Sequence, residues 1–272
     1  MKGSMNKTLL QLLLATTLLG ILLFLGIHSN TQEITLNLLS RRSAPSLQFW
    51  FGTDNLGRDL WLRCLQGMMT SIQIGFITAL CSGLLALVIA ILSQLSKTMD
   101  YLIRTLIDTF IALPHLLLLI LICFTFGGGK WGVITAVSLT HWPKLALILR
   151  SELLRIGQAD YILLAQRTGL SRWQCCYKHY LPLLLPQLLV GALLIFPHAV
   201  LHSAGLSFLG FGLEPHEPSL GLLLSDALRY LSSGDWWLAV YPGLTLVILV
   251  LTIDQLARGL QKIWLRKSSC YN

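Results

Sequence analysis

The sequence predicts an all-α membrane protein with six transmembrane helices. Apolar residues make up 54% of the 272 residues and charged residues only 12%, and the mean hydropathy is +0.69. A soluble domain carries about twice that share of charge. The apolar residues also gather in runs of roughly 20, the length that crosses about 30 Å of hydrocarbon. The expected spans cover residues 8–27, 71–93, 105–126, 132–149, 184–208 and 238–260.

The first expected span begins like a secretory signal. Lys2 and Lys7 precede a long apolar run, and no small-residue cleavage site follows it. This pattern predicts an uncleaved signal-anchor helix over residues 1–30. A polar stretch, residues 31–70, separates it from the second span, and we expect that stretch to be extracytoplasmic.

The distribution of cations predicts the orientation. With a cytoplasmic N-terminus, 14 of the 20 Lys and Arg residues fall on the cytoplasmic side and 6 on the other. Cytoplasmic loops are enriched in Lys and Arg, so we expect a multi-pass protein of the cytoplasmic (inner) membrane with both termini inside. The net charge of +8 then reflects topology and contact with anionic membrane lipid. No nucleic-acid motif is present, so no nucleic-acid partner is expected.

Residues 158–182 form an amphipathic, cation-bearing segment between two apolar spans, which predicts a surface presented to a partner. Gly169 can take the left-handed conformation that ends a first short helix. Ser171 and Gln174 have the spacing of a capping box that starts a second. Pro182 is expected to close the segment.

The polar stretch before the second span contains the string GTDNLGRD, residues 52–59. Thr53 or Asp54 can cap a short helix. That helix would carry apolar side chains on one side and lie on the outer leaflet. Its apolar residues are Leu60, Trp61, Leu65 and Met68.

Both segments resemble permease subunits of ATP-binding cassette (ABC) importers, in the branch for dipeptides, oligopeptides and nickel. The loop matches at Ala165, Gly169 and Leu181–Pro182, and departs from the pattern at Leu163 and Leu164. The resemblance implies the type I importer permease fold, with residues 71–265 as the permease domain and 158–182 as its coupling loop. The implied ATPase-coupling residues are Asp160, Leu164, Ala165, Gly169, Ser171, Leu181 and Pro182. The implied entrance residues are Gly52, Thr53, Asp54, Gly57, Arg58 and Asp59.

The same resemblance implies partners and excludes catalysis in this chain. It implies a paralogous permease subunit, two ATPase subunits and an extracytoplasmic substrate-binding protein. The run Gly127–Lys130 is not a phosphate-binding loop, because Phe124 and Trp131 stand where the motif needs Gly and Ser or Thr. No acid, base and nucleophile cluster is visible. We therefore expect a non-catalytic subunit without a cofactor, with ATP hydrolysed elsewhere.

Two histidines indicate the class of cargo. His198 and His202 are four residues apart, so their imidazoles share one helix face and can hold a first-row divalent metal between them. The pair also resembles the nickel permease subunit of C type, as does His141 in THW, although its expected depth places His141 far from the pair. Helix packing remains an alternative role. A zinc protease is excluded because position 199 is Ala and not Glu.

These patterns favour the permease subunit of an ATP-driven importer for nickel or a nickel chelate. An importer of di- or oligopeptides, or of an opine-type metallophore–metal complex, is the alternative within the same class. An ion-driven secondary transporter is the alternative of another class. Such a carrier would show an internal repeat or ionisable residues at mid-membrane, and neither is evident.

Overall fold

The computed structural model describes residues 2–30, 32, 35–214 and 217–268. Within these ranges the chain is helical, without a named strand. Five stretches of helix are long and apolar enough to cross a membrane, and a bent pair of helices makes a sixth candidate. The helices that form the five stretches are α1 (Lys2–Asn30), α2 (Leu60–Leu92), α5 (Gly129–Gly157), α8 (Leu181–Phe208) and α10 (Trp237–Ser268). The bent pair is α3 (Lys97–Ala112) with α4 (His115–Thr125).

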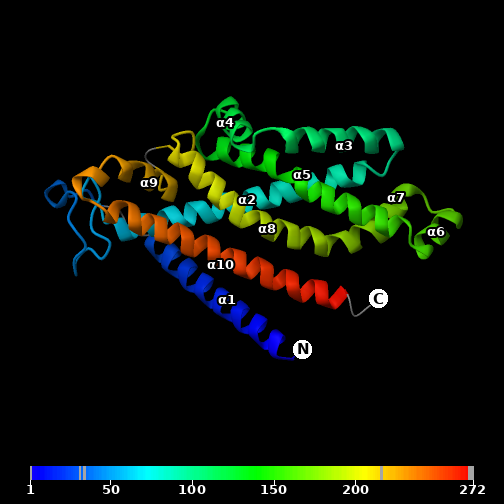
Figure 1. Cartoon of the computed structure of the whole chain (residues 1–272), viewed down its shortest axis with the longest axis horizontal. Helices are drawn as coiled ribbons and strands as arrows, with labels where there is room; N and C mark the ends of the chain where they lie inside the picture. Colours follow the sequence, from blue (N-terminus) through cyan, green and yellow to red (C-terminus); the bar gives the residue numbers. More distant parts are fainter. Residues whose placement is uncertain (1, 31, 33–34, 215–216, 269–272) are drawn as a thin grey trace.

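Short elements gather at the two ends of this bundle (Figure 1). One end carries α6 (Asp160–Arg167) and α7 (Arg172–Cys175), and the start of α1 and the end of α10 point toward it. The other end carries α9 (Leu220–Leu228) and the connections around it. We call these the α6 end and the α9 end. The remaining short elements are the 3-10 turns η1 (Leu38–Ser40) and η3 (Leu231–Ser233) and the π-helical turn η2 (Cys176–Tyr180).

Helix α2 lies at the centre and packs against both α5 and α8. Small residues allow this close approach, as is common between membrane helices. Ala86 and Ala90 of α2 are fully buried, and a Cβ added at Gly75 would lie 2.5 Å from the ring of Phe196 on α8. Helix α1 packs chiefly on α10, beside α2.

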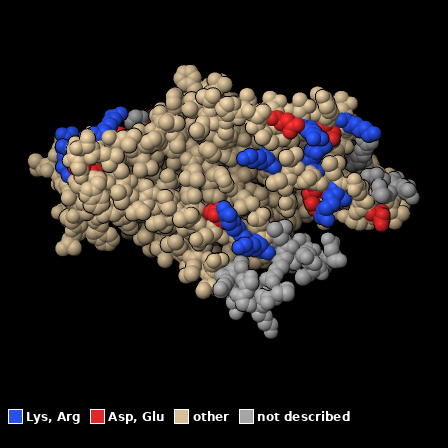
Figure 2. Space-filling view, viewed as in Figure 1, with Lys and Arg blue, Asp and Glu red and all other residues tan. Residues whose placement is uncertain are grey.

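Figure 2 shows charged side chains at the α9 end and over much of the half of the visible face toward the α6 end, with a largely uncharged zone between them. This is the surface that hydrocarbon requires, because an unpaired charge in the bilayer is costly. Large apolar side chains are exposed along the long helices, among them Phe24, Phe76 and Leu121. The all-α membrane fold predicted from composition is therefore confirmed.

Two expected elements differ in the structure. The third span, expected as one helix over 105–126, bends by 100° between α3 and α4. Leu113 is extended (φ −73°, ψ 144°), as residues before proline usually are, and Pro114 then caps α4. The short interfacial helix from Leu60 is instead the first part of α2, and its cap is Asp59, whose carboxylate accepts from the Trp61 N–H at 2.9 Å.

Candidate functional site

We call residues 51–59, which include the predicted entrance residues, the entrance segment. The buried carboxylate of Asp54 organises it. One oxygen accepts hydrogen bonds from the backbone N–H groups of Leu56 (2.8 Å) and Arg58 (2.9 Å). The other accepts from the side chains of Arg58 and Arg63, each at 2.7 Å. Arg63 is on α2, so this single carboxylate ties the turn to the second span.

Burial opposes ionisation of Asp54, but the hydrogen bond from the Arg58 N–H and the charge of Arg63 outweigh it. The pKa of Asp54 therefore lies below its ordinary value. A carboxylate satisfied in this way is structural, and it has no lone pair directed to a ligand. Thr53 has a similar role: its hydroxyl accepts from the Ser43 N–H at 2.8 Å and donates to the Ser40 carbonyl.

The same segment packs on the start of α10. Phe51 stacks on Tyr241 with ring centroids 4.1 Å apart, and meets Trp61 edge-on at 4.7 Å. Gly52 and Gly57 both have positive φ, 75° and 72°. The predicted entrance residues are thus brought together, as a folded elbow against α2 and α10.

The coupling segment, residues 158–182, has the predicted hinge. Gly169 has φ 94°, in the left-handed region. The predicted capping box is present: the Ser171 N–H donates to the Gln174 side chain at 2.9 Å, and the Gln174 N–H donates to the Ser171 hydroxyl at 3.3 Å. Asp160 is the first residue of α6 and is exposed.

The end of the segment differs from the prediction. Leu181 and Pro182 do not close it; they are the first residues of α8, and the helix runs on from α7 through η2. Proline lacks an N–H and crowds the preceding turn. The wider π-helical turn at Cys176–Tyr180 sits directly before it, where a π-bulge relieves such a conflict.

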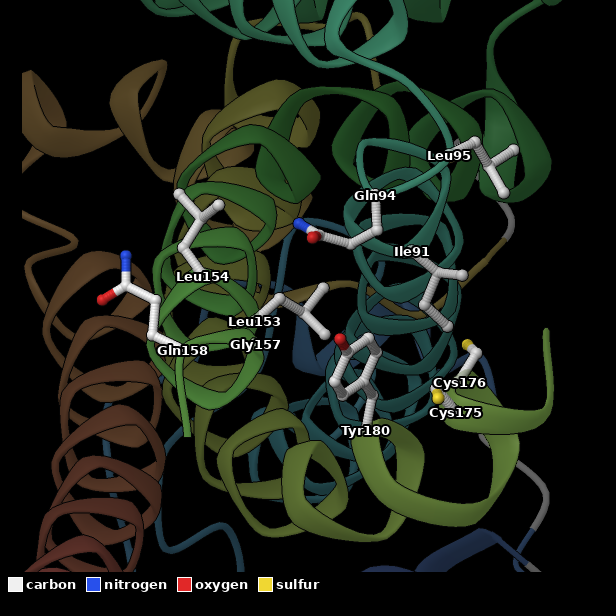
Figure 3. Close-up of a pocket in the computed structure, with 10 residues that line it drawn as sticks. All are labelled: Ile91, Gln94, Leu95, Leu153, Leu154, Gly157, Gln158, Cys175, Cys176 and Tyr180. Atoms are coloured by element: carbon white, nitrogen blue, oxygen red, sulfur yellow. The ribbon is translucent and has the colours of Figure 1, made fainter. Parts of the chain in front are cut away.

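A few buried side chains fix the coupling segment to the bundle. Ile162 is fully buried in the apolar core at the α6 end, and Cys175 is nearly so. A cavity of about 330 Å³ lies beside them, between the ends of α2 and α5 and the start of η2. Figure 3 shows Tyr180 pointing toward Leu153 and Gln94 in this cavity. Tyr161 and Leu164 of α6 are 51% and 62% exposed, so α6 presents an apolar surface outward; the side chain of Ala165 lies outside the described residues.

Three helices bring three histidines together. We call His115 of α4, His141 of α5 and His202 of α8 the histidine cluster. Their ring centroids are 4.7 to 5.1 Å apart. One ring nitrogen from each can be chosen so that all three lie within 4.8 Å of one another. All three side chains are half-buried.

The expected depth of His141, far from His202, is therefore wrong. His198 lies one turn from His202 on α8, but it is exposed and is not among the three. Its Nδ1 is 3.0 Å from the Leu194 carbonyl oxygen. The sequence did not indicate His115 as a member of this cluster, because no regular spacing links it to His141 or His202. The only sequence signal was Pro114, which marks the bend between α3 and α4 that places His115 beside α5 and α8.

Lys144, counted with the cytoplasmic cations from the sequence, instead lies inside α5, 15 residues after Gly129 and 13 before Gly157. It is one turn from His141, it is exposed, and its charge acts on His115 and His202. An ionisable residue at mid-span is usually functional. The cluster and Lys144 together form a cationic, donor-rich region.

Pairs of opposite charges also lie on the helices α3 and α5. Arg150 of α5 holds Asp100 of α3 through two hydrogen bonds of 2.6 and 2.8 Å, a contact that the sequence did not indicate. Arg104 and Asp108, one turn apart on α3, are 3.9 Å apart and both about two-thirds exposed, so their attraction is weak.

Comparisons with known proteins place these features in a family. Residues 82–267 match the model of the family described as binding-protein-dependent transport system inner membrane component. A Brucella suis protein named as a candidate peptide transport system permease is 35% identical over 223 residues, which are 82% of this chain and 75% of that protein. The dipeptide transport system permease DppC of Bacillus subtilis is 30% identical over 239 residues, 88% of this chain and 74% of that protein.

Among solved structures, a chain of the MetNI methionine ABC transporter in inward-facing conformations has a TM-score of 0.58. The match covers 74% of this chain and 97% of that one, at 22% identity. At this identity the likeness is one of fold.

Proposed function

This chain belongs to the family of binding-protein-dependent transport system inner membrane components, and from that premise we propose that its importer carries di- or oligopeptides. The chain is the membrane-spanning, non-catalytic subunit of an ABC importer, in which a separate subunit hydrolyses ATP. Family membership favours an ABC importer over an ion-driven secondary transporter.

The peptide assignment is supported by the names of relatives that match most of the chain, at 35% and 30% identity. The cationic region in the spans is consistent with it. A peptide carries a free carboxylate, and Lys144 offers an exposed ammonium at mid-span, where the low dielectric strengthens such attraction.

Nickel, or a nickel chelate such as a metal–opine complex, is the second candidate. The observation that favours it is the histidine cluster, because imidazole nitrogens are good ligands for nickel and its neighbours in the first transition series. The resemblance of His202 and His141 to the nickel permease subunit of C type belongs to this candidate, which does not depend on His198, because His198 is exposed and lies outside the cluster.

We further propose the assembly and the orientation. A paralogous permease subunit, two ATPase subunits and an extracytoplasmic binding protein complete the importer in the inner membrane. The α6 end and both termini face the cytoplasm, where Tyr161 and Leu164 offer an apolar contact for an ATPase groove. Helix-in-groove docking of this kind is common between proteins.

Uptake by cells that lack the chromosomal copy of this chain tests the cargo. We expect the plasmid-borne chain to restore uptake of a radiolabelled dipeptide, and vanadate, which blocks ABC ATPases, to abolish the restored uptake. The control measures uptake of radioactive nickel in the same cells. Restoration of nickel uptake without any restoration of peptide uptake would reject the peptide proposal in favour of the second candidate.

A further inference from the structure

We infer that His115, His141 and His202 form a binding site for a first-row divalent metal ion that arrives already held by a carboxylate-bearing ligand. The inference deepens the proposed function, because it rests on the importer assignment and names a chemical class of cargo. A peptide or opine that chelates a metal belongs to that class, which unites the peptide relatives with the imidazole cluster.

The first support is geometric. The three nitrogens lie within 4.8 Å of one another and come from three separate helices, α4, α5 and α8. A metal bound at 2.0 to 2.1 Å from each nitrogen would draw them to roughly 3 Å apart. Side-chain rotation of half-buried imidazoles can supply that contraction without moving a helix.

The second support is the hydrogen bonding of the rings. His141 Nδ1 is 2.9 Å from the Val137 carbonyl oxygen. A carbonyl can only accept, so Nδ1 carries the proton and Nε2 keeps its lone pair for a metal, as metal-binding histidines usually arrange. Among the described residues, the imidazoles of His115 and His202 form no hydrogen bond with another protein group, so their ring nitrogens are available to a ligand.

The charges around the cluster favour a metal that is already bound to a carboxylate ligand over a bare dication. No Asp or Glu of the described residues joins the cluster, so three neutral imidazoles would leave the charge of a bare dication uncompensated. The ammonium of Lys144, one turn from His141, adds to that charge. A metal that brings its own carboxylates removes this cost, and Lys144 then attracts the ligand.

This distribution of donors also suits transport. The three imidazoles would occupy only one face of the metal, and the carried ligand keeps the other. Such binding is partial and reversible, as a transport pathway requires, because a site that holds its cargo too tightly does not release it.

The test is metal binding to the purified importer containing the full chain, measured by isothermal titration calorimetry. The probes are NiCl2 alone and nickel iminodiacetate, whose dicarboxylate ligand leaves one face of the metal open. We expect His202→Gln or His115→Gln to weaken nickel iminodiacetate binding at least tenfold. The matched control is His198→Gln, on the same helix as His202 and one turn away, which should change it less than twofold.

A second variant tests the role of charge. Lys144→Met should tighten binding of NiCl2 severalfold and weaken binding of nickel iminodiacetate. Gel filtration of each variant shows whether the complex stays assembled; if His202→Gln disrupts it, His115→Gln, at the first turn of α4, provides the test.

The inference is overturned if the intact importer binds neither probe, or if His198→Gln weakens binding as much as the cluster variants do. These results are independent of the peptide uptake test. Failure of the unaltered importer to bind either probe, together with normal dipeptide uptake, would reject the metal-bearing cargo and leave the peptide importer standing. Metal binding by the intact importer without any peptide uptake would reject the peptide proposal and leave the metal site standing.

Discussion

Single residues at the entrance segment determine its shape. Asp54 satisfies two backbone N–H groups and two arginines, and its lowered pKa makes the carboxylate a source of stability above the pKa of an unfolded Asp. That contribution is lost as the pH falls through the lowered pKa. Gly57 sits in the same turn with φ 72°, and a Cβ there would lie 1.7 Å from the Asn37 carbonyl oxygen.

Gly57→Ala should therefore destabilise the protein by more than backbone strain alone. Gly127→Ala is the matched control, since Gly127 has φ 82° but open space around its Cβ position. We expect Gly127→Ala to cost about 1 kcal/mol and Gly57→Ala clearly more, as a lower thermal unfolding midpoint in detergent. Equal midpoints for the two variants would show that the turn around Asn37 can open freely.

At the scale of elements, the coupling segment combines a buried anchor with an exposed glycine joint. Ile162 and Cys175 are buried in the bundle, while Gly169, between α6 and α7, is exposed with nothing within 4 Å of its Cβ position. A substitution at Gly169 therefore changes backbone preference without creating a clash. A substitution at Gly169 therefore tests whether this joint couples ATP hydrolysis to movement of the spans, without the side effect of a steric clash.

Gly169→Val should reduce import and ATPase copurification while the subunit remains in the membrane at normal abundance, because a β-branched residue resists positive φ. Gly169→Asn is the control, since Asn tolerates the left-handed region, and it should retain most activity. Transport assays and affinity purification in parallel measure both effects. Normal import and ATPase binding by the Val variant would remove the coupling role from this segment.

At the scale of the whole molecule, charge and apolar surface set the orientation in the membrane. Charged side chains lie at the α9 end and over the half of the visible face toward the α6 end (Figure 2), and the N-terminal end of α1 points toward the α6 end (Figure 1). The excess of cations predicted for the cytoplasm therefore belongs to the α6 end. Lys144 is the exception, since it lies near the middle of α5.

Cysteine labelling in intact cells tests this orientation. In a chain whose six cysteines are replaced, Lys130→Cys should react with a membrane-impermeant maleimide, and Arg172→Cys should react only after the membrane is opened. Lys130 lies at the start of α5 and Arg172 at the start of α7, so the two report opposite faces. The reverse pattern would reject both the orientation and the ATPase contact at α6.

The sequence by itself determined the membrane class, the long apolar helices, the left-handed joint at Gly169 and the capping box of Ser171 and Gln174. These features depend on local composition, on the conformational range of one residue, or on hydrogen bonds across one helical turn. The ABC importer class was also predictable, because the strings at 52–59 and 160–182 are local. The roles of Asp160, Leu181 and the other proposed coupling residues stay predictions.

Only the tertiary structure decided how separate helices meet. The contacts of Asp100 with Arg150, of Asp54 with Arg63, and of His141 with His115 and His202 join residues whose spacing in the sequence carries no periodic signal. The sequence favoured His198 beside His202, since four residues make one helical turn. The bend of 100° at Pro114 instead places His115 beside His141 and His202. The direction of a helix after such a bend depends on the surfaces of α5 and α8 against which it packs.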